Sequence, residues 1–212
     1  PLVDRFSIEK NNKTTSNPDL FTAHPEVVLL PGSRQRELEK HLPGMLEAVK
    51  IIATELKIKV RIVLPDKKML ILAKHIVPTG TEIILQIGNL EESLNHAILT
   101  IASSGTVTME CAWFKVPTVV VYKTSLITYI IGKLLVKVPY VAMPNILAEE
   151  EIFPEFIQNE ATPDNIAKAS LRILQDSTER QKILTGLEHI ASQLGEPGAT
   201  NRAAKSILHS IE

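Results

Sequence analysis

The sequence predicts an α/β domain with a doubly wound, parallel, Rossmann-like sheet, and two observations carry that prediction. From residue 26 onward, short apolar runs alternate with longer amphipathic runs. Such alternation is typical of right-handed strand–helix–strand units, whose helices cover both faces of a parallel sheet. The first apolar run, residues 27–30, is continuous and stops at Pro31-Gly32. That pattern indicates a strand buried on both faces.

The other elements follow from the same reading. Strands are expected at residues 27–30, 60–64, 83–87, 98–102 and 118–122. A helix is expected at residues 35–56, where apolar residues recur at three- and four-residue spacing, and Pro43 within it predicts a kink or a break into two helices. Further helical pattern covers residues 90–96, 109–113, 125–136 and 163 to the end.

Composition and charge narrow the function classes. The 212 residues are 44% hydrophobic and 22% charged, an ordinary globular composition. A net charge of -1 and only 4% aromatic residues argue against a nucleic-acid partner. The single cysteine, Cys111, excludes an internal disulfide and fits a reducing compartment. The most apolar stretch, residues 126–136, is too short to span a bilayer.

The start of the chain suggests a fragment. It begins at Pro1 rather than at a methionine, and residues 9–19 are polar and rich in turn formers. We interpret residues 1–25 as an interdomain segment that follows a missing N-terminal domain. Residues 26–195 are then one Rossmann-like domain, and residues 196–212 a C-terminal helix set apart by Gly195-Glu196-Pro197-Gly198. A separated helix leaves room for subunit exchange in a homodimer.

The loop Pro31-Gly32-Ser33-Arg34, directly after the first strand, has the residues of a phosphate-binding turn. Ligands of open parallel sheets collect beyond the carboxyl ends of the strands. Gly32 lacks a Cβ that would block a ligand, Ser33 is expected to cap the next helix, and Arg34 supplies a guanidinium for a diphosphate. The alternative is an ordinary turn with a surface arginine.

A second specialised loop, Ser103-Ser104-Gly105-Thr106, lies between the fourth strand and the next helix. A helix N-terminus with hydroxyl groups and a glycine suits phosphate groups. Glu110 follows Thr106 by about one turn, where a carboxylate can accept hydrogen bonds from ribose hydroxyls. The alternative is an ordinary helix cap with a solvated glutamate. The loop is neither a Walker A motif nor a dinucleotide fingerprint.

Other candidates carry weaker signals. Asn145, after Pro144, is expected to cap a helix, and Gln158 alone is an unremarkable helix residue. The acidic run at residues 149–151 is better explained as a solvated face than as a metal site, and Cys111 as a buried inert thiol. Residues 124–140 are apolar with interspersed lysines, which suits either a membrane interface or a core helix.

Together these segments resemble the lipid-A-disaccharide synthase family. The resemblance covers nearly the whole chain, and several motifs in order are far more specific than any one. The similar segments are Val28 to Leu38 with Leu42-Pro43, Ser103 to Glu110, Pro117 to Lys123, Leu134 to Val141, Met143 to Ala148 and Pro154 to Gln158. Pro1-Leu2-Val3-Asp4 also resembles the segment that joins the family's two domains.

The resemblance implies the donor-binding, C-terminal half of a GT-B glycosyltransferase. The family joins UDP-2,3-diacylglucosamine to 2,3-diacylglucosamine 1-phosphate (lipid X), inverts the anomeric centre, and needs no metal and no cofactor. It works in the cytoplasm, with peripheral contact to the inner face of the bacterial inner membrane left open. Its catalytic base is an acidic residue of the N-terminal domain, so the resemblance implies that this chain alone binds UDP weakly and turns over little or nothing.

The same resemblance implies the roles of individual residues. Arg34, beside Gly32 and Ser33, would hold the diphosphate and stabilise UDP as it leaves. Ser104, Gly105 and Thr106 would add hydrogen-bond donors and Glu110 would contact the ribose. Asn145 and Gln158 would line the donor pocket near the uracil or the sugar.

Two features depart from the family pattern. Glu149-Glu150 stands where a Gly-Arg pair is common, which removes the positive charge that a phosphate contact there would use. Lys123 replaces an arginine and keeps the charge without the bidentate geometry. Two rival interpretations stay open: another UDP-GlcNAc-using GT-B enzyme, such as an epimerase or the muramyl-peptide transferase, and a non-catalytic nucleotide-binding module.

Overall fold

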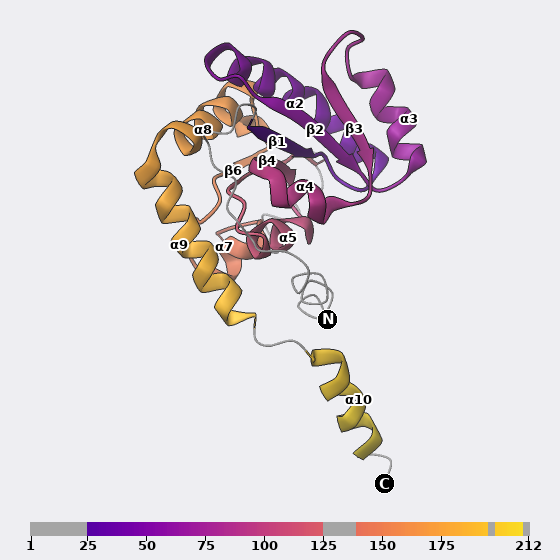
Figure 1. Cartoon of the computed structure of the whole chain (residues 1–212), viewed down its shortest axis with the longest axis vertical. Coiled ribbons are helices and arrows are strands. Elements are labelled where there is room, and N and C mark those ends of the chain that lie inside the picture. The colour runs from indigo at the N-terminus through magenta and orange to yellow at the C-terminus, as the bar shows by residue number, and fades with distance from the viewer. Residues whose placement is uncertain (1–24, 125–138, 195–197, 210–212) are drawn as a thin grey trace.

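The computed structural model describes residues 25–124, 139–194 and 198–209 (Figure 1). Its strands are β1 (Glu26–Leu30), β2 (Lys59–Leu64), β3 (Ile83–Ile87), β4 (Ala97–Ser103), β5 (Thr118–Tyr122) and β6 (Glu155–Ile157). They form one sheet in the order β3-β2-β1-β4-β5-β6, and every neighbouring pair is parallel. The predicted doubly wound, Rossmann-like sheet is confirmed, with winding that reverses between β1 and β4.

Helices cover the sheet on both faces. They are α2 (Gln35–Glu55), α3 (Lys67–Ile76), α4 (Leu90–His96), α5 (Val107–Trp113), α7 (Met143–Ala148), α8 (Pro163–Gln175), α9 (Ser177–Gln193) and α10 (Ala199–His209), with a 3₁₀ turn, η1 (Gln158–Glu160). Helix α2 packs between α3 and α8, whereas α5 packs on α7 and α9. Helix α9 therefore joins the two layers along one side of the domain (Figure 1).

The central strands form because their sequences suit burial on both faces. Every residue of β1 and β4 is buried, and the two strands pair in register from Val27↔Leu99 to Leu30↔Ala102. Continuous runs of Val, Ile and Leu are what a covered parallel sheet requires. The apolar face of α2, which includes Leu38, Leu42, Met45 and Ile52, is fully buried against this core.

The prediction of a break at Pro43 is wrong, because α2 runs without interruption from Gln35 to Glu55. Proline removes one helical hydrogen bond and leaves a carbonyl unpaired four residues earlier. Pro43 lies on the exposed side of the helix, where water can satisfy that carbonyl. The strand predictions at residues 60–64, 83–87, 98–102 and 118–122 agree with β2 to β5 within one residue at each end.

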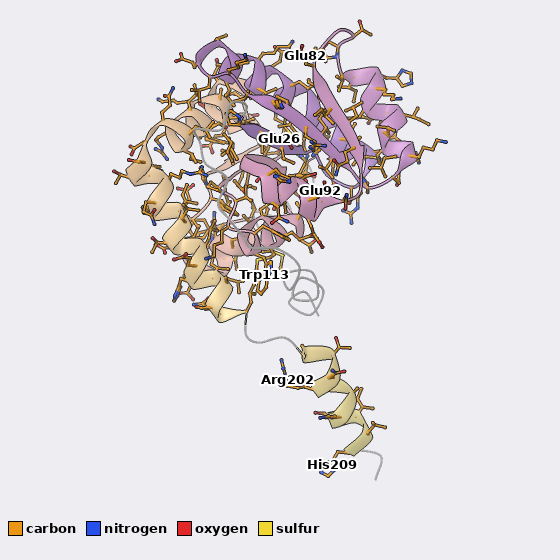
Figure 2. All side chains as sticks on the ribbon, in the orientation of Figure 1. Glu26, Glu82, Glu92, Trp113, Arg202 and His209 are labelled. Atoms are coloured by element: carbon orange, nitrogen blue, oxygen red, sulfur yellow. The ribbon has the colours of Figure 1, made fainter. Side chains whose placement is uncertain are left out.

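Helix α10 stands apart from the body of the domain (Figure 1). None of its residues is buried, and Ile207 and Leu208 are exposed by more than half. In Figure 2 its labelled residues Arg202 and His209 lie well away from the sheet. Among the described residues no helix has both the length and the apolar character needed to cross a membrane.

Several expectations concern residues outside the described part of the chain. They are the helix at residues 125–136, most of the interdomain segment at residues 1–25, and most of the break at Gly195-Glu196-Pro197-Gly198. The proposed membrane-interface segment, residues 124–140, lies largely in the same undescribed part.

Candidate nucleotide-binding site

The two loops that the sequence singled out meet at one pocket. Strands β1 and β4 are neighbours, so the loops that follow them emerge side by side where the winding reverses. A pocket of about 560 Å³ opens there. Its lining includes seven of the predicted residues: Gly32, Ser33, Arg34, Ser104, Gly105, Thr106 and Glu110.

The strand order β3-β2-β1-β4 places the lining residues of α5 on one side of β1 and those of β2 and after β3 on the other, which gives the pocket a polar end and an apolar end. Thr106 and Glu110, from the start of α5, lie at the polar end, and the whole of Glu110 is only 8% exposed. The other end is lined by Val63 and Leu64 of β2, by Pro65 after it, and by Gly88 and Leu90, which follow β3. A site with one charged and hydroxylated end and one apolar end suits a ligand that joins phosphates to a flat ring.

The backbone of the first loop is occupied by a carboxylate of the chain itself. One oxygen of Glu37 accepts hydrogen bonds from the N–H groups of Ser33 and Arg34, at 3.0 and 3.2 Å. The other oxygen lies 3.2 Å from Nη1 of Arg34. The N-cap of α2 is therefore Arg34, with Glu37 folded back over it, and the prediction that Ser33 caps the helix is wrong.

Gly32 is required for a different reason than the sequence suggested. Its φ of +115° disfavours other residues, and a Cβ there would lie 2.5 Å from Oε2 of Glu37. The missing side chain thus makes room for Glu37. Glu37 was not singled out from the sequence, although an acidic residue three positions after a helix cap is the usual signal for such a contact.

The second loop is also partly satisfied within the chain. Ser104 donates its N–H to the carbonyl of Val121 at 3.2 Å and its hydroxyl to that of Val141 at 2.8 Å. Both of its hydrogen-bond donors are therefore in use, and the expectation that Ser104 adds donors for a ligand does not fit this geometry. Thr106, the exposed N-cap residue of α5, lines the pocket, and no side-chain capping bond of its own is formed.

A chain of polar side-chain contacts across β1, β2 and β3 fixes the wall of the pocket at its apolar end. Glu26 (labelled in Figure 2) pairs with Arg61, 2.6 Å from its Nε, and Arg61 donates to Oε1 of Gln86 at 2.6 Å. The amide of Gln86 in turn donates to the carbonyls of Gly88 and Asn89. Gly88 and Asn89 both have a left-handed φ, so the Gln86 side chain holds the turn that borders the pocket.

A buried histidine ties the first loop to the end of β5. Nε2 of His41 accepts the N–H of Lys123 at 2.9 Å, so Nδ1 carries the proton and donates to the carbonyl of Pro31 at 3.0 Å. Burial lowers the pKa of His41 below its ordinary 6.5, although the Pro31 carbonyl and Glu37 act in the opposite direction. The Lys123 N–H that Nε2 accepts favours the unprotonated nitrogen. The ring is therefore neutral, which is the form that both hydrogen bonds need. His41 lies three residues after Leu38 on the apolar face of α2, a spacing that signals burial.

Two predicted residues are absent from the pocket lining: Lys123 follows β5, and Gln158 follows the neighbouring strand β6. Lys123 is half-buried and contributes its backbone N–H to His41. Gln158 opens η1 with a φ of +52°, and its Oε1 accepts the N–H of Thr124 at 3.0 Å. It is thus a backbone anchor rather than an unremarkable helix residue.

Asn145, expected to cap a helix and to line the donor pocket, does neither. It is fully buried within α7, and its side chain holds the following turn: Oδ1 accepts from Ile152 and Phe153, and Nδ2 donates to the carbonyl of Phe153 and to Glu155. An amide with both ends satisfied in the interior has no group left for a ligand.

Glu155 completes the same network and was not anticipated from the sequence. It accepts the N–H groups of Val141 and Ala142 at 2.9 and 2.8 Å. Burial raises the pKa of Glu155, whereas these hydrogen bonds and Asn145 favour its charged form. Because Val141 also accepts the hydroxyl of Ser104, Glu155 supports the second loop from behind.

The remaining candidates do not contribute to this pocket. Cys111 is fully buried, as predicted, and burial raises the pKa of its thiol to about 11. Glu150 and Glu151 border a larger hollow of about 1,060 Å³ beside α9, away from the carboxyl ends of β1 and β4. Across the described residues no group of three or more His, Cys, Asp or Glu side chains is arranged to hold a metal ion.

Comparisons with known proteins agree with this architecture. A model of the family described as lipid-A-disaccharide synthetase matches residues 1–209. A lipid-A-disaccharide synthase of Myxococcus xanthus is 36% identical over 192 residues, which are 88% of this chain and 49% of that protein. The chain thus spans about half the length of the curated relatives it matches.

Solved structures with this fold include nucleotide-bound proteins. The S. aureus MnaA–UDP co-structure superposes with a TM-score of 0.63 at 12% identity, covering 99% of this chain and 52% of that one. A spinosyn rhamnosyltransferase complexed with thymidine diphosphate gives a TM-score of 0.62 at 14% identity, covering 87% and 46%. At such identities the likeness shows a shared fold, that of GT-B glycosyltransferase and epimerase domains.

The His41 geometry predicts a specific loss of stability in acid. The unfolded chain binds a proton on this ring near pH 6.5, whereas the folded chain resists protonation. The contribution of His41 to the free energy of unfolding is therefore complete above pH 6.5 and is lost as the pH falls below it. The slope is at most about 1.4 kcal/mol per pH unit. Urea unfolding at pH 7.5, 6.0 and 5.0 measures it.

His41→Gln, which cannot titrate, is the matched variant. Both proteins share every other titrating group, including Glu155, so the difference between them isolates His41. The wild-type chain is expected to lose more free energy of unfolding than the variant between pH 7.5 and 5.0. Parallel pH profiles for the two proteins would show that the ring is not held neutral.

Proposed function

Because this chain belongs to the lipid-A-disaccharide synthetase family, we propose that its pocket holds the UDP portion of a UDP-sugar donor. We further propose that the parent protein transfers 2,3-diacylglucosamine from that donor to lipid X. The observation that carries the proposal is the convergence of Arg34, Thr106 and Glu110 on one pocket where the sheet reverses its winding. Their chemistry matches the parts of a nucleoside diphosphate.

Arg34 is the residue best suited to the diphosphate. It is the one lysine or arginine among the described residues that line the pocket, and its side chain is 83% exposed. A guanidinium can form two parallel hydrogen bonds with phosphate oxygens. As the glycosidic bond breaks, the departing UDP gains negative charge, which a positioned cation stabilises.

The two ends of the pocket suit the rest of the nucleotide. Glu110 lies at the polar end, where its carboxylate would accept hydrogen bonds from ribose hydroxyls. Pro65 and Leu90 lie at the other end, where a uracil ring would find apolar contact. Thr106 would add a hydroxyl beside the phosphates. Gly105 lies next to it and leaves the loop without a side chain at that point.

Turnover requires more than this site. By family resemblance, the group that deprotonates the acceptor hydroxyl belongs to the N-terminal half of the whole protein, and this chain spans about half of its relatives' length. We therefore propose that the 212-residue chain binds UDP without forming disaccharide. By family resemblance the reaction would take place in the cytoplasm, and because both proposed substrates carry acyl chains, it would lie beside the inner face of the inner membrane.

Calorimetry with UDP tests the donor site. The 212-residue chain is expected to bind UDP, and Arg34→Ala is expected to weaken binding at least about tenfold, since hydrogen bonds to charged groups contribute about 1.5–3 kcal/mol. Arg36→Ala is the matched control, because Arg36 is an exposed arginine two residues along α2 that does not line the pocket. No heat at millimolar UDP, or equal losses in both variants, would count against the proposal.

The transfer reaction itself needs the parent protein. Incubation of the full-length protein with UDP-2,3-diacylglucosamine and lipid X is expected to yield a β-1′,6-linked disaccharide and UDP, detected by mass spectrometry. The Arg34→Ala form of the same protein should be strongly impaired. Release of UDP without disaccharide, or formation of a different sugar product, would sink this assignment.

A further inference from the structure

The carboxylate of Glu37 lies where the first loop would otherwise receive an anion. Its two oxygens accept the N–H groups of Ser33 and Arg34 and pair with the Arg34 guanidinium. Phosphate groups bind to backbone N–H groups and arginine side chains at such loops. The chain therefore fills this anion position with its own negative charge.

The same carboxylate borders the candidate donor pocket. Glu37 is part of the lining, and its side chain remains 29% exposed. It is held by two backbone N–H groups, so it does not swing away freely as a solvated surface glutamate would. Gly32 preserves this arrangement, since any Cβ there would collide with Glu37.

We propose that Glu37 competes with the donor's diphosphate for Arg34 and thereby sets how tightly the site holds UDP. The proposal rests on the function proposed above and names a specificity-determining residue of that site. When a diphosphate arrives, Arg34 exchanges a carboxylate for phosphate oxygens while Glu37 stays on the loop N–H groups. The remaining negative charge repels the ligand, which favours release of UDP after transfer.

The exchange is energetically accessible. An exposed ion pair such as Arg34–Glu37 contributes little to stability, so Arg34 leaves it at small cost. The repulsion between a fixed carboxylate and a diphosphate within one small pocket is larger, because the surroundings are less polar than bulk water. Glu37 thus lowers affinity for phosphate-bearing ligands far more than for the nucleoside alone.

A purely structural role predicts a different outcome. As a helix cap, Glu37 only needs an oxygen that accepts the two N–H groups, and glutamine provides one. Glu37→Gln therefore keeps the cap and removes the charge. Glu39→Gln is the matched control, because Glu39 is an exposed glutamate of the same helix that does not line the pocket.

Calorimetry on the 212-residue chain with UDP and with uridine separates the two roles. We expect Glu37→Gln to bind UDP about three- to tenfold more tightly than the wild-type chain, with little change for uridine and none for Glu39→Gln. The thermal midpoint of each variant confirms that it is folded. Glu37→Ala, which loses the cap as well, should also bind UDP more tightly if it stays folded.

A double variant tests the competition itself. In an Arg34→Ala background, Glu37→Gln should still improve UDP binding, because the repulsion remains, and by only a slightly smaller factor, because releasing the guanidinium costs little. Unchanged or weaker UDP binding by a folded Glu37→Gln chain would overturn the inference. If the wild-type chain itself does not bind UDP, the proposed function fails, which is a separate and distinguishable result.

Discussion

The parallel pairing of β1 with β4 is the constraint on which the rest of this structure depends. These two strands are far apart in the sequence, yet they are the central pair of the sheet and every residue of both is buried. Their register brings Leu30 opposite Ala102, so both strands end at the same level. The loops that follow must then share one pocket, whatever their detailed chemistry.

Around that pocket, the chain uses its own charged and polar side chains to hold loop backbone. Glu37 holds the loop after β1, Glu155 holds the segment behind the loop after β4, and His41 links Pro31 to Lys123. Each of these groups is placed by a long helix or by a strand of the sheet. Such support fixes the geometry of a site before a ligand arrives, which is the basis of preorganised binding.

The spacing of apolar residues predicted the architecture, because the buried positions of a helix or strand recur at regular intervals in the sequence. The strands β2 to β5 lie within a residue of where they were expected, because short runs of Val, Ile and Leu that end at turns are typical of buried strands. The strand β6 was not anticipated, because three residues, Glu155–Ile157, are too few for a pattern to register. The break expected at Pro43 did not occur, since local propensity yields to burial of the helix on both sides of it.

The candidate site was predictable in its residue types and less so in their contacts. Loop composition correctly pointed to seven residues that line one pocket. It did not show that the N–H and hydroxyl of Ser104 donate to the carbonyls of Val121 and Val141. Nor did it show that the side-chain amide of Asn145 is hydrogen-bonded to the backbone of Phe153, eight residues later. Those partners are set by tertiary packing, and nothing in the spacing of the residues encodes them.

The central claim, that a nucleoside diphosphate binds where β1 and β4 end, is tested most directly by NMR on a glycine-labelled chain. Three glycines line the pocket (Gly32, Gly88 and Gly105), whereas Gly186 lies in the larger hollow beside α9 and Gly44 and Gly80 border neither. On titration with UDP, the amide signals of the three pocket glycines should shift while those of Gly44, Gly80 and Gly186 stay in place. A shift at Gly186 with the pocket glycines unmoved would contradict the account.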